Sequence, residues 1–148
     1  MAAPVEVRAV KETDATALVP LFRAFFGDHF GEDVTAETVS RRLRRVSRAE
    51  TFLVAVEGAR MVGFTSLRVL PAIDPTPYAE VTDLFVAEGA RRQGIGTALL
   101  RQCEELARSR GAGNLVLLTG RENREAKAFY KSLGYEDYAL ALRKSLKR

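Results

Sequence analysis

The segment of this chain whose residues are best suited to bind a ligand is a turn between a strand-like and a helix-like stretch. Residues 80–86 read Glu-Val-Thr-Asp-Leu-Phe-Val, and the turn after them contains Arg91-Arg92-Gln93-Gly94-Ile95-Gly96. A helix N-terminus presents unpaired backbone N–H groups at the positive end of its dipole. Glycine lets the backbone approach an anion without a Cβ in the way, and the two arginines add cationic donors. The turn therefore predicts a phosphate-binding site.

Three kinds of phosphate site could use such a turn. A nucleotide P-loop needs Lys-Ser or Lys-Thr after its last glycine, and Gly96 is followed by Thr97-Ala98. A dinucleotide fingerprint needs a glycine or alanine where Leu99 stands, and an acidic residue closing the next strand. The third kind is the Arg-x-x-Gly-x-Gly turn that cradles the pyrophosphate of coenzyme A, and it is intact here. Taken alone, this turn fits a purely structural role equally well.

A second segment, one strand further along the chain, supports the coenzyme A interpretation. It follows the pattern Asn-x-x-Ala-x-x-Phe-Tyr-x-x-Leu-Gly-Tyr, at Asn123, Ala126, Phe129, Tyr130, Leu133, Gly134 and Tyr135. With both segments in this order, the chain resembles the GNAT superfamily of acetyl-CoA-dependent N-acetyltransferases over essentially its whole length. The resemblance is specific from Glu80 to Tyr135 and topological over residues 1–70. Two departures, Glu88 in place of a frequent proline and Arg92 in place of a frequent glycine, remove no backbone N–H.

The resemblance implies how the chain would hold acetyl-CoA. Main-chain groups of Leu84, Phe85 and Val86 would pair with the pantetheine as a missing strand would. The pyrophosphate would lie on the turn residues Arg91, Arg92, Gln93, Gly94, Ile95, Gly96 and Thr97. Further contacts would come from Asn123, Ala126, Phe129 and Tyr130. Phe129 is better explained by packing, and Asn123 at a helix start could be a cap.

The resemblance also implies catalytic roles. The N–H of Leu84 would donate to the oxyanion of the tetrahedral intermediate. An amine attacks only when neutral, so a base is useful, and Glu80 matches the carboxylate base of some family members. An ideal strand separates Glu80 from Leu84 by about 13 Å, so we expect a bulge, a long acceptor or a relay water. Asp83 is the alternative base if the register slips, and Tyr130 would protonate the departing sulfur. A solvated strand-end carboxylate is the bland alternative for either acid.

The acceptor is suggested only by charge. The segment Phe25–Glu37 contains no lysine or arginine and has four acidic residues: Asp28, Glu32, Asp33 and Glu37. A small cationic amine would be attracted there. A protein or peptide amine is an alternative acceptor, and a non-catalytic coenzyme A sensor is an alternative function. The arginines of Arg41–Arg48 could bind nucleic acid, but an exposed helix face explains them better because no recognition pattern accompanies them.

The elements that must position these residues follow from periodicity. Strands are predicted at Val5–Val10, Phe52–Val56, Met61–Val69, Glu80–Val86 and Leu115–Thr119, the last one wholly apolar and therefore buried on both faces. Helices are predicted after Thr13-Asp14, from Thr35, over Thr97–Arg110 and over Glu122–Leu133. One or two final strands are predicted within Tyr135–Leu146. This order indicates a mixed α/β fold, a largely antiparallel sheet with helices on both faces, as in the GNAT fold.

Length and composition set the remaining limits. The 148 residues, 47% hydrophobic and 28% charged, predict one domain spanning 1–148. No apolar run suits a membrane span and no signal peptide is visible, which favours a cytoplasmic protein without a membrane partner. One cysteine and one histidine argue against a disulfide and a Cys/His metal site, and Cys103 fits a buried apolar stripe rather than an acyl-enzyme nucleophile. A homodimer is possible in this family, and no nucleic-acid partner is expected.

Overall fold

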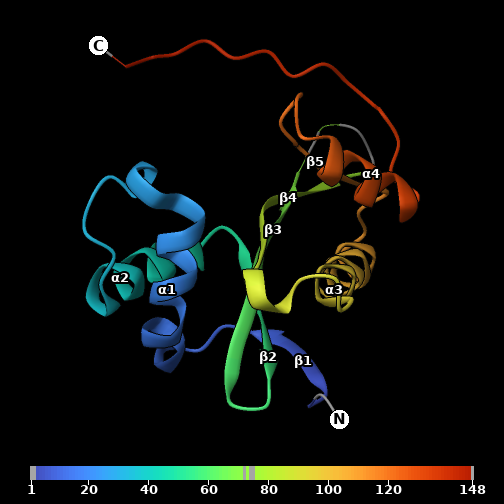
Figure 1. The fold of residues 1–148 in the computed structure, drawn as a ribbon. Helices are drawn as coiled ribbons and strands as arrows, with labels where there is room; N and C mark the ends of the chain where they lie inside the picture. Colours follow the sequence, from blue (N-terminus) through green and yellow to red (C-terminus); the bar gives the residue numbers. More distant parts are fainter. Residues whose placement is uncertain (1–2, 72, 74–75, 148) are drawn as a thin grey trace. The chain divides into compact units, whose positions relative to one another are not determined.

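The computed structural model describes residues 3–71, 73 and 76–147, and these residues divide between two compact units, Met1–Val116 and Leu117–Arg148. Figure 1 shows the elements of both. The first unit begins with β1 (Val5–Ala9) and two helices, α1 (Ala15–Phe26) and α2 (Ala36–Val46). The strands β2 (Thr51–Glu57), β3 (Arg60–Leu70) and β4 (Tyr78–Val86) follow, and α3 (Ile95–Ser109) leads to β5 (Asn114–Leu117). The second unit contains α4 (Arg124–Ser132).

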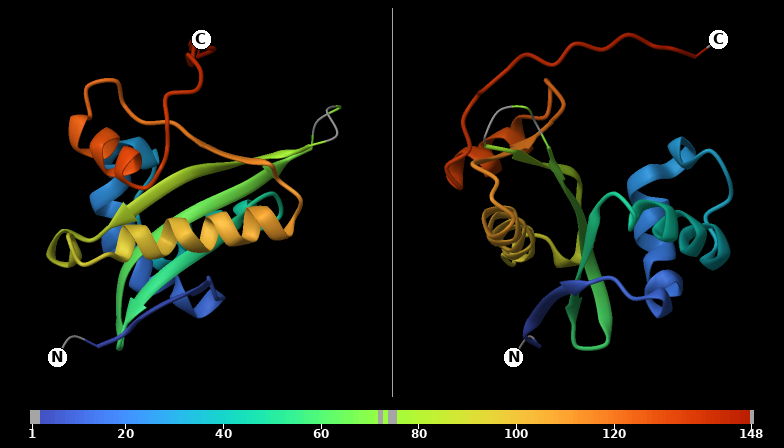
Figure 2. Two further views of the ribbon diagram at one scale, coloured as in Figure 1. Left: turned by 90° about the vertical axis from the view of Figure 1, so that its right-hand side faces the viewer. Right: turned by 180° about the vertical axis from the view of Figure 1, so that it is seen from behind.

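The sheet is built mainly by antiparallel neighbours in sequence order. Its strand order is β1-β2-β3-β4-β5, and the β1/β2, β2/β3 and β3/β4 pairs are antiparallel. The helix α3 crosses over between β4 and β5, as parallel neighbours require. In Figure 2 the helices α1 and α2 lie on one face of the sheet and α3 lies on the other. This three-layer arrangement is the mixed α/β fold predicted from the sequence.

The two faces of the sheet pack differently. On the α1/α2 face an aromatic core forms around Phe22, Phe52 and Phe64, whose rings lie 5.1–6.0 Å apart. On the α3 face there is no room for a side chain at Gly63, because a Cβ there would lie 2.8 Å from the Phe85 carbonyl oxygen of β4 and 3.3 Å from the Leu99 side chain of α3. Glycine at position 63 therefore lets both the backbone of β4 and the helix α3 pack closely on β3.

The pairing of β3 with β4 contains a β-bulge beside the candidate site. Arg68 pairs with Glu80 and Leu67 with Val81, but Ser66 pairs with Asp83, so Thr82 is an extra residue in β4. Residues three apart on a regular strand point to opposite faces. The bulge instead places Glu80 and Asp83 on one face, because their partners are two residues apart. The bulge expected between Glu80 and Leu84 is thus present.

The element boundaries agree with the sequence predictions within a few residues, except near the C-terminus. Residues 135–147 contain no strand, although one or two were predicted within Tyr135–Leu146. Tyr138, Leu140, Leu142 and Leu146 are 71–88% exposed. Apolar alternation alone does not make a strand, because the ordering entropy must be offset by a hydrogen-bonded neighbour. The prediction that Leu115–Thr119 is buried on both faces is also wrong: β5 ends at Leu117, its apolar residues are half-buried, and Leu118 is 68% exposed.

Candidate active site

The backbone N–H of Leu84 lies on the edge of β4 that faces away from β3. The carbonyl of Asp83 points toward β3, since it accepts a 2.7 Å hydrogen bond from the Thr65 hydroxyl. In a trans peptide the following N–H points the opposite way, so the Leu84 N–H points away from β3. The 2.8 Å bond from the Ala87 N–H to the Val62 carbonyl agrees, because ladder alternation then makes Thr65 and Leu84 a non-hydrogen-bonded pair.

The neighbouring strand on that side is too short to cover this edge. The Gly113 N–H donates to the Pro77 carbonyl at 3.0 Å, so β5 starts beside the start of β4. It has four residues whereas β4 has nine. The half-buried segment Leu84–Val86 therefore extends past the end of β5, and no other strand of the described residues lies beside it on this side. An extended ligand could pair with such an edge.

The turn after β4 has the geometry of an anion site. Gly94 is the N-cap of α3 in the left-handed conformation, with φ of 79°, and it provides no side-chain cap. The first intrahelical bond runs from the Ala98 N–H to the Gly94 carbonyl, so the N–H groups of Ile95, Gly96 and Thr97 precede the ladder. Arg91, Arg92, Gln93 and Gly94 are exposed.

The two arginines of the turn have different environments. The Nε of Arg91 donates to the Val86 carbonyl at 3.1 Å, and its guanidinium lies 5.7 Å from the Phe85 ring centre. Its side chain therefore folds back on the end of β4. Arg92 has φ of 63°, the left-handed region that explains why glycine is frequent at this place.

Three carboxylates lie on the α1/α2 face near the bulge. Glu80 pairs with Arg68, with 3.3 Å between Oε2 and Nη2. Asp83 forms no ion pair within the described part of the chain, and burial together with the nearby Glu50 raises the pKa of its carboxyl above the usual range. The two candidate bases predicted from the sequence therefore have different surroundings. Glu80 forms an ion pair with an arginine, and Asp83 forms none within the described residues.

Glu50 is a site residue that sequence reasoning missed. Its carboxylate accepts hydrogen bonds from the Ser66 hydroxyl and, at 3.0 Å, from the Thr82 hydroxyl. It thereby links the bulge residue of β4 to its partner strand. Glu50 is 16 residues from Ser66 and 32 from Thr82, so only the register of the sheet brings them together.

In the second unit, the predicted coenzyme A residues lie on α4. The Asn123 side chain caps this helix by accepting from the Ala126 N–H at 3.1 Å, which is the capping role predicted as one of its two alternatives. Phe129 and Tyr130 are half-buried, with ring centres 5.4 Å apart, and Tyr130 lies 6.0 Å from Tyr135. Burial raises the pKa of Tyr130, so the phenol stays protonated at neutral pH.

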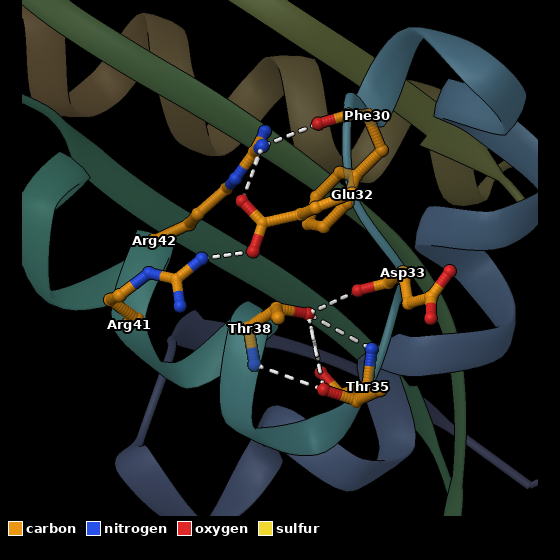
Figure 3. Close-up of polar contacts among 7 residues, drawn as sticks. All are labelled: Phe30, Glu32, Asp33, Thr35, Thr38, Arg41 and Arg42. Atoms are coloured by element: carbon orange, nitrogen blue, oxygen red, sulfur yellow. Dashed lines mark hydrogen bonds and ion pairs between the residues drawn. The ribbon is translucent and has the colours of Figure 1, made fainter.

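The acidic segment proposed to attract the acceptor is partly neutralised. Figure 3 shows the Glu32 carboxylate held by both Arg41 and Arg42, and Arg42 also reaches the Phe30 carbonyl. The Arg42 guanidinium lies 3.8 Å from the Phe30 ring centre. Two of the arginines within Arg41–Arg48 therefore form ion pairs with Glu32, which precedes α2 in the sequence.

Cys103 is fully buried against β3, and burial raises its pKa to about 11. A thiol with this pKa remains protonated at neutral pH, which argues against an acyl-cysteine intermediate. Among residues 3–71, 73 and 76–147, no group of three or more His, Cys, Asp or Glu side chains could hold a metal ion. No described helix is long and apolar enough to span a membrane.

Comparisons with known proteins identify the family to which this chain is similar. Residues 16–135 match the acetyltransferase (GNAT) family. The uncharacterised N-acetyltransferase YhfO of Bacillus subtilis is 31% identical over 135 residues, 88% of this chain and 89% of that protein. The aminoglycoside N(6')-acetyltransferase type 1 of Klebsiella aerogenes is 26% identical over 90% of both chains. The crystal structure of an aminoglycoside acetyltransferase from a soil metagenome, in complex with sisomicin, has a TM-score of 0.78 at 22% identity over 97% of both chains. The chain therefore belongs to the acetyltransferase (GNAT) family, which confirms the resemblance, the fold and the acyltransferase class predicted from its sequence.

Proposed function

We propose that this chain transfers the acetyl group of acetyl-CoA to a primary amine by direct attack within a ternary complex. The observation that carries this proposal is the Asp83–Leu84 peptide, whose N–H points to the edge of β4 away from β3, beside the half-buried Asp83 carboxylate, which forms no ion pair within the described part of the chain. A donor for the oxyanion and a base for the amine thus belong to adjacent residues. The family membership supplies the reaction class.

The residues proposed to bind acetyl-CoA fit its chemistry. The backbone of Leu84, Phe85 and Val86 would pair with the amide groups of the pantetheine. The uncapped N-terminus of α3, with the turn residues Arg91, Arg92, Gln93, Gly94, Ile95, Gly96 and Thr97, would bind the pyrophosphate. In the second unit, Asn123, Ala126, Phe129 and Tyr130 are proposed to contact the coenzyme.

The reaction needs two proton movements. The amine nitrogen attacks the thioester carbonyl, and the carbonyl oxygen becomes an oxyanion that accepts from the Leu84 N–H. The base takes a proton from the attacking nitrogen, the carbon–sulfur bond breaks, and the sulfur takes a proton from the Tyr130 phenol. The products are an N-acetyl amide and free coenzyme A. Tyr130 is proposed as the acid because its phenol is protonated at neutral pH.

Of the two candidate bases, Asp83 has the more suitable environment. Glu80 already forms an ion pair with Arg68, with 3.3 Å between Oε2 and Nη2. Asp83 has no such partner in the described residues, and its raised pKa brings it closer to the operating pH. Glu80, the base predicted from the sequence, is the alternative, and mutation of each residue distinguishes the two.

A small cationic amine is the acceptor that the charges favour. Glu50 and Asp83 place two carboxylates near the reacting peptide without an arginine or lysine partner in the described part of the chain. Two proteins similar to this one are named aminoglycoside acetyltransferases, and aminoglycosides are polycationic amines. A protein or peptide amine is the alternative acceptor. A cytoplasmic location and a homodimer stay predictions.

The test is an acceptor screen by mass spectrometry. The protein is incubated with acetyl-CoA and separate panels of aminoglycosides, polyamines, neutral and acidic amino compounds, and peptides with free N-termini or lysines. We expect thiol release that depends on the acceptor, and an acetylated product among the cationic small amines. Preference for acidic amines would refute the charge argument. Acetyl-CoA binding without acceptor-dependent thiol release would indicate a sensor and refute the enzyme proposal.

A further inference from the structure

The hydroxyl of Thr65 contacts the peptide group that contains the Leu84 N–H. Thr65 is fully buried on β3 and donates at 2.7 Å to the Asp83 carbonyl. This carbonyl belongs to the same peptide group as the Leu84 N–H. The other residues of β3 on this face include Gly63 and Leu67, so the hydroxyl lies in apolar surroundings. A buried hydroxyl is tolerated there because it is hydrogen-bonded.

We propose that Thr65 is a positioning residue for acetyl transfer, which orients and polarises the Asp83–Leu84 peptide so that its N–H binds the oxyanion. This inference rests on the proposed function. Thr65 lies on β3, behind the peptide, and acts only through it.

The physical effect has two parts. A hydrogen bond to a peptide carbonyl draws electron density from the amide, so the N–H at the other end becomes a stronger donor. The bond also fixes the plane of the Asp83–Leu84 peptide, which begins one residue after the bulge residue Thr82, where the ladder of β3 and β4 is interrupted. A preorganised donor stabilises the oxyanion without reorganising during the reaction.

Cys103 extends this chain of hydrogen bonds to α3. Its sulfur lies 3.9 Å from the Thr65 Oγ1, as donor to that oxygen, and its raised pKa keeps the thiol protonated. Because the thiol donates to Oγ1, the Thr65 proton is left to point at the Asp83 carbonyl. A direct link thus runs from the core of α3 to the edge of β4.

The test compares Thr65→Val, which keeps the shape and loses the hydroxyl, with Thr65→Ser, which restores it. Removing a whole oxyanion donor lowers kcat by about 100- to 1000-fold, and weakening one by about 10–30% gives a smaller loss. We therefore expect Thr65→Val to lower kcat by about 2- to 10-fold with little change in KM for acetyl-CoA. Thr65→Ser should recover most of this loss. Val54→Ala, a fully buried change in β2, is the control for destabilisation alone.

A second readout needs neither substrate nor activity. In the nuclear magnetic resonance spectrum of the ligand-free protein, Thr65→Val should move the Asp83 carbonyl carbon and the Leu84 amide proton upfield, and Val54→Ala should not. Unchanged resonances would overturn the inference. So would a Thr65→Val enzyme with normal kcat, or one that loses no more activity than Val54→Ala. If the wild-type protein acetylates nothing, the proposed function fails, while the resonances still report separately on whether Thr65 sets the peptide.

Discussion

Replacing Asp83 by asparagine should abolish most of the activity, whereas replacing Glu80 by glutamine should not. Asp83 adjoins Leu84, so the two Cα atoms are about 3.8 Å apart. Glu80 pairs with Arg68 of β3 and Leu84 pairs with Thr65, three residues away. The Cα atoms of Glu80 and Leu84 are therefore about 10 Å apart. The base oxygen must come within about 2.6–3.2 Å of the nitrogen whose proton it abstracts, or act through one water. Asp83 can meet this requirement directly, and Glu80 needs a water.

The size of the effect follows from the role. A positioned general base contributes about 100- to 10,000-fold, so Asp83→Asn should lower kcat/KM at least about 100-fold. Glu80→Gln should lower kcat/KM less than about 10-fold, because this carboxylate is already engaged by Arg68 and lies farther from Leu84. Asparagine and glutamine keep the side-chain size in both variants, so each is a matched control for the other.

The assay is coenzyme A release as a function of pH, with an amine found in the acceptor screen. The unprotonated carboxylate is the active form, and burial and Glu50 raise the pKa of Asp83. Wild-type activity should therefore fall as pH decreases through this raised pKa, and Asp83→Asn should lose that acid limb. If Glu80→Gln loses the limb and Asp83→Asn retains it, the assignment is wrong and Glu80 is the base.

Three further outcomes test other contacts. Glu50→Gln should shift the acid limb of the pH profile to lower pH, because the negative charge that raises the pKa of Asp83 is removed while an acceptor oxygen for Ser66 and Thr82 stays; an unmoved limb would contradict this coupling. Asp14→Asn should reduce the free energy of unfolding at pH 7 by about 1–3 kcal/mol in urea titrations, because Asp14 accepts from Arg8 at 2.7 and 2.9 Å. Arg8 lowers the pKa of Asp14, so this contribution is present above about pH 4 and disappears as pH falls through the lowered value; an equal difference at pH 2 would refute it. Gly94→Ala should raise KM for acetyl-CoA with little change in kcat. A residue with a side chain is strained by about 1–2 kcal/mol at φ of 79°, although the added Cβ would contact no other atom. An unchanged KM would show that this turn does not bind acetyl-CoA.

The sequence predicts those parts of the molecule that local pattern determines. Strand alternation, helix periodicity and the glycine turn lie within short windows, and the structure has these elements near the expected positions. The final strands are wrong because a strand also depends on a neighbour, which no local pattern contains. The pairing of Glu32 could not be predicted for a similar reason, since Arg41 and Arg42 reach its carboxylate from the next helix. The contacts of Asp83 with Thr65 and Glu50 depend on sheet register, and the roles of the carboxylates follow from it.

Two consecutive residues of β3 hold the bulge of β4 from opposite faces of the sheet. Thr65 fixes the Asp83 carbonyl from the α3 face, and Ser66 shares the Glu50 carboxylate with Thr82 on the α1/α2 face. A bulge is normally a weak point of pairing, because one residue has no partner. Here side-chain hydrogen bonds link the bulge to β3 on one face, and on the other face they hold the peptide that we propose to bind the oxyanion. The rigid sheet, rather than a loop, can thus set the direction of the Leu84 N–H and the position of the Asp83 carboxylate together.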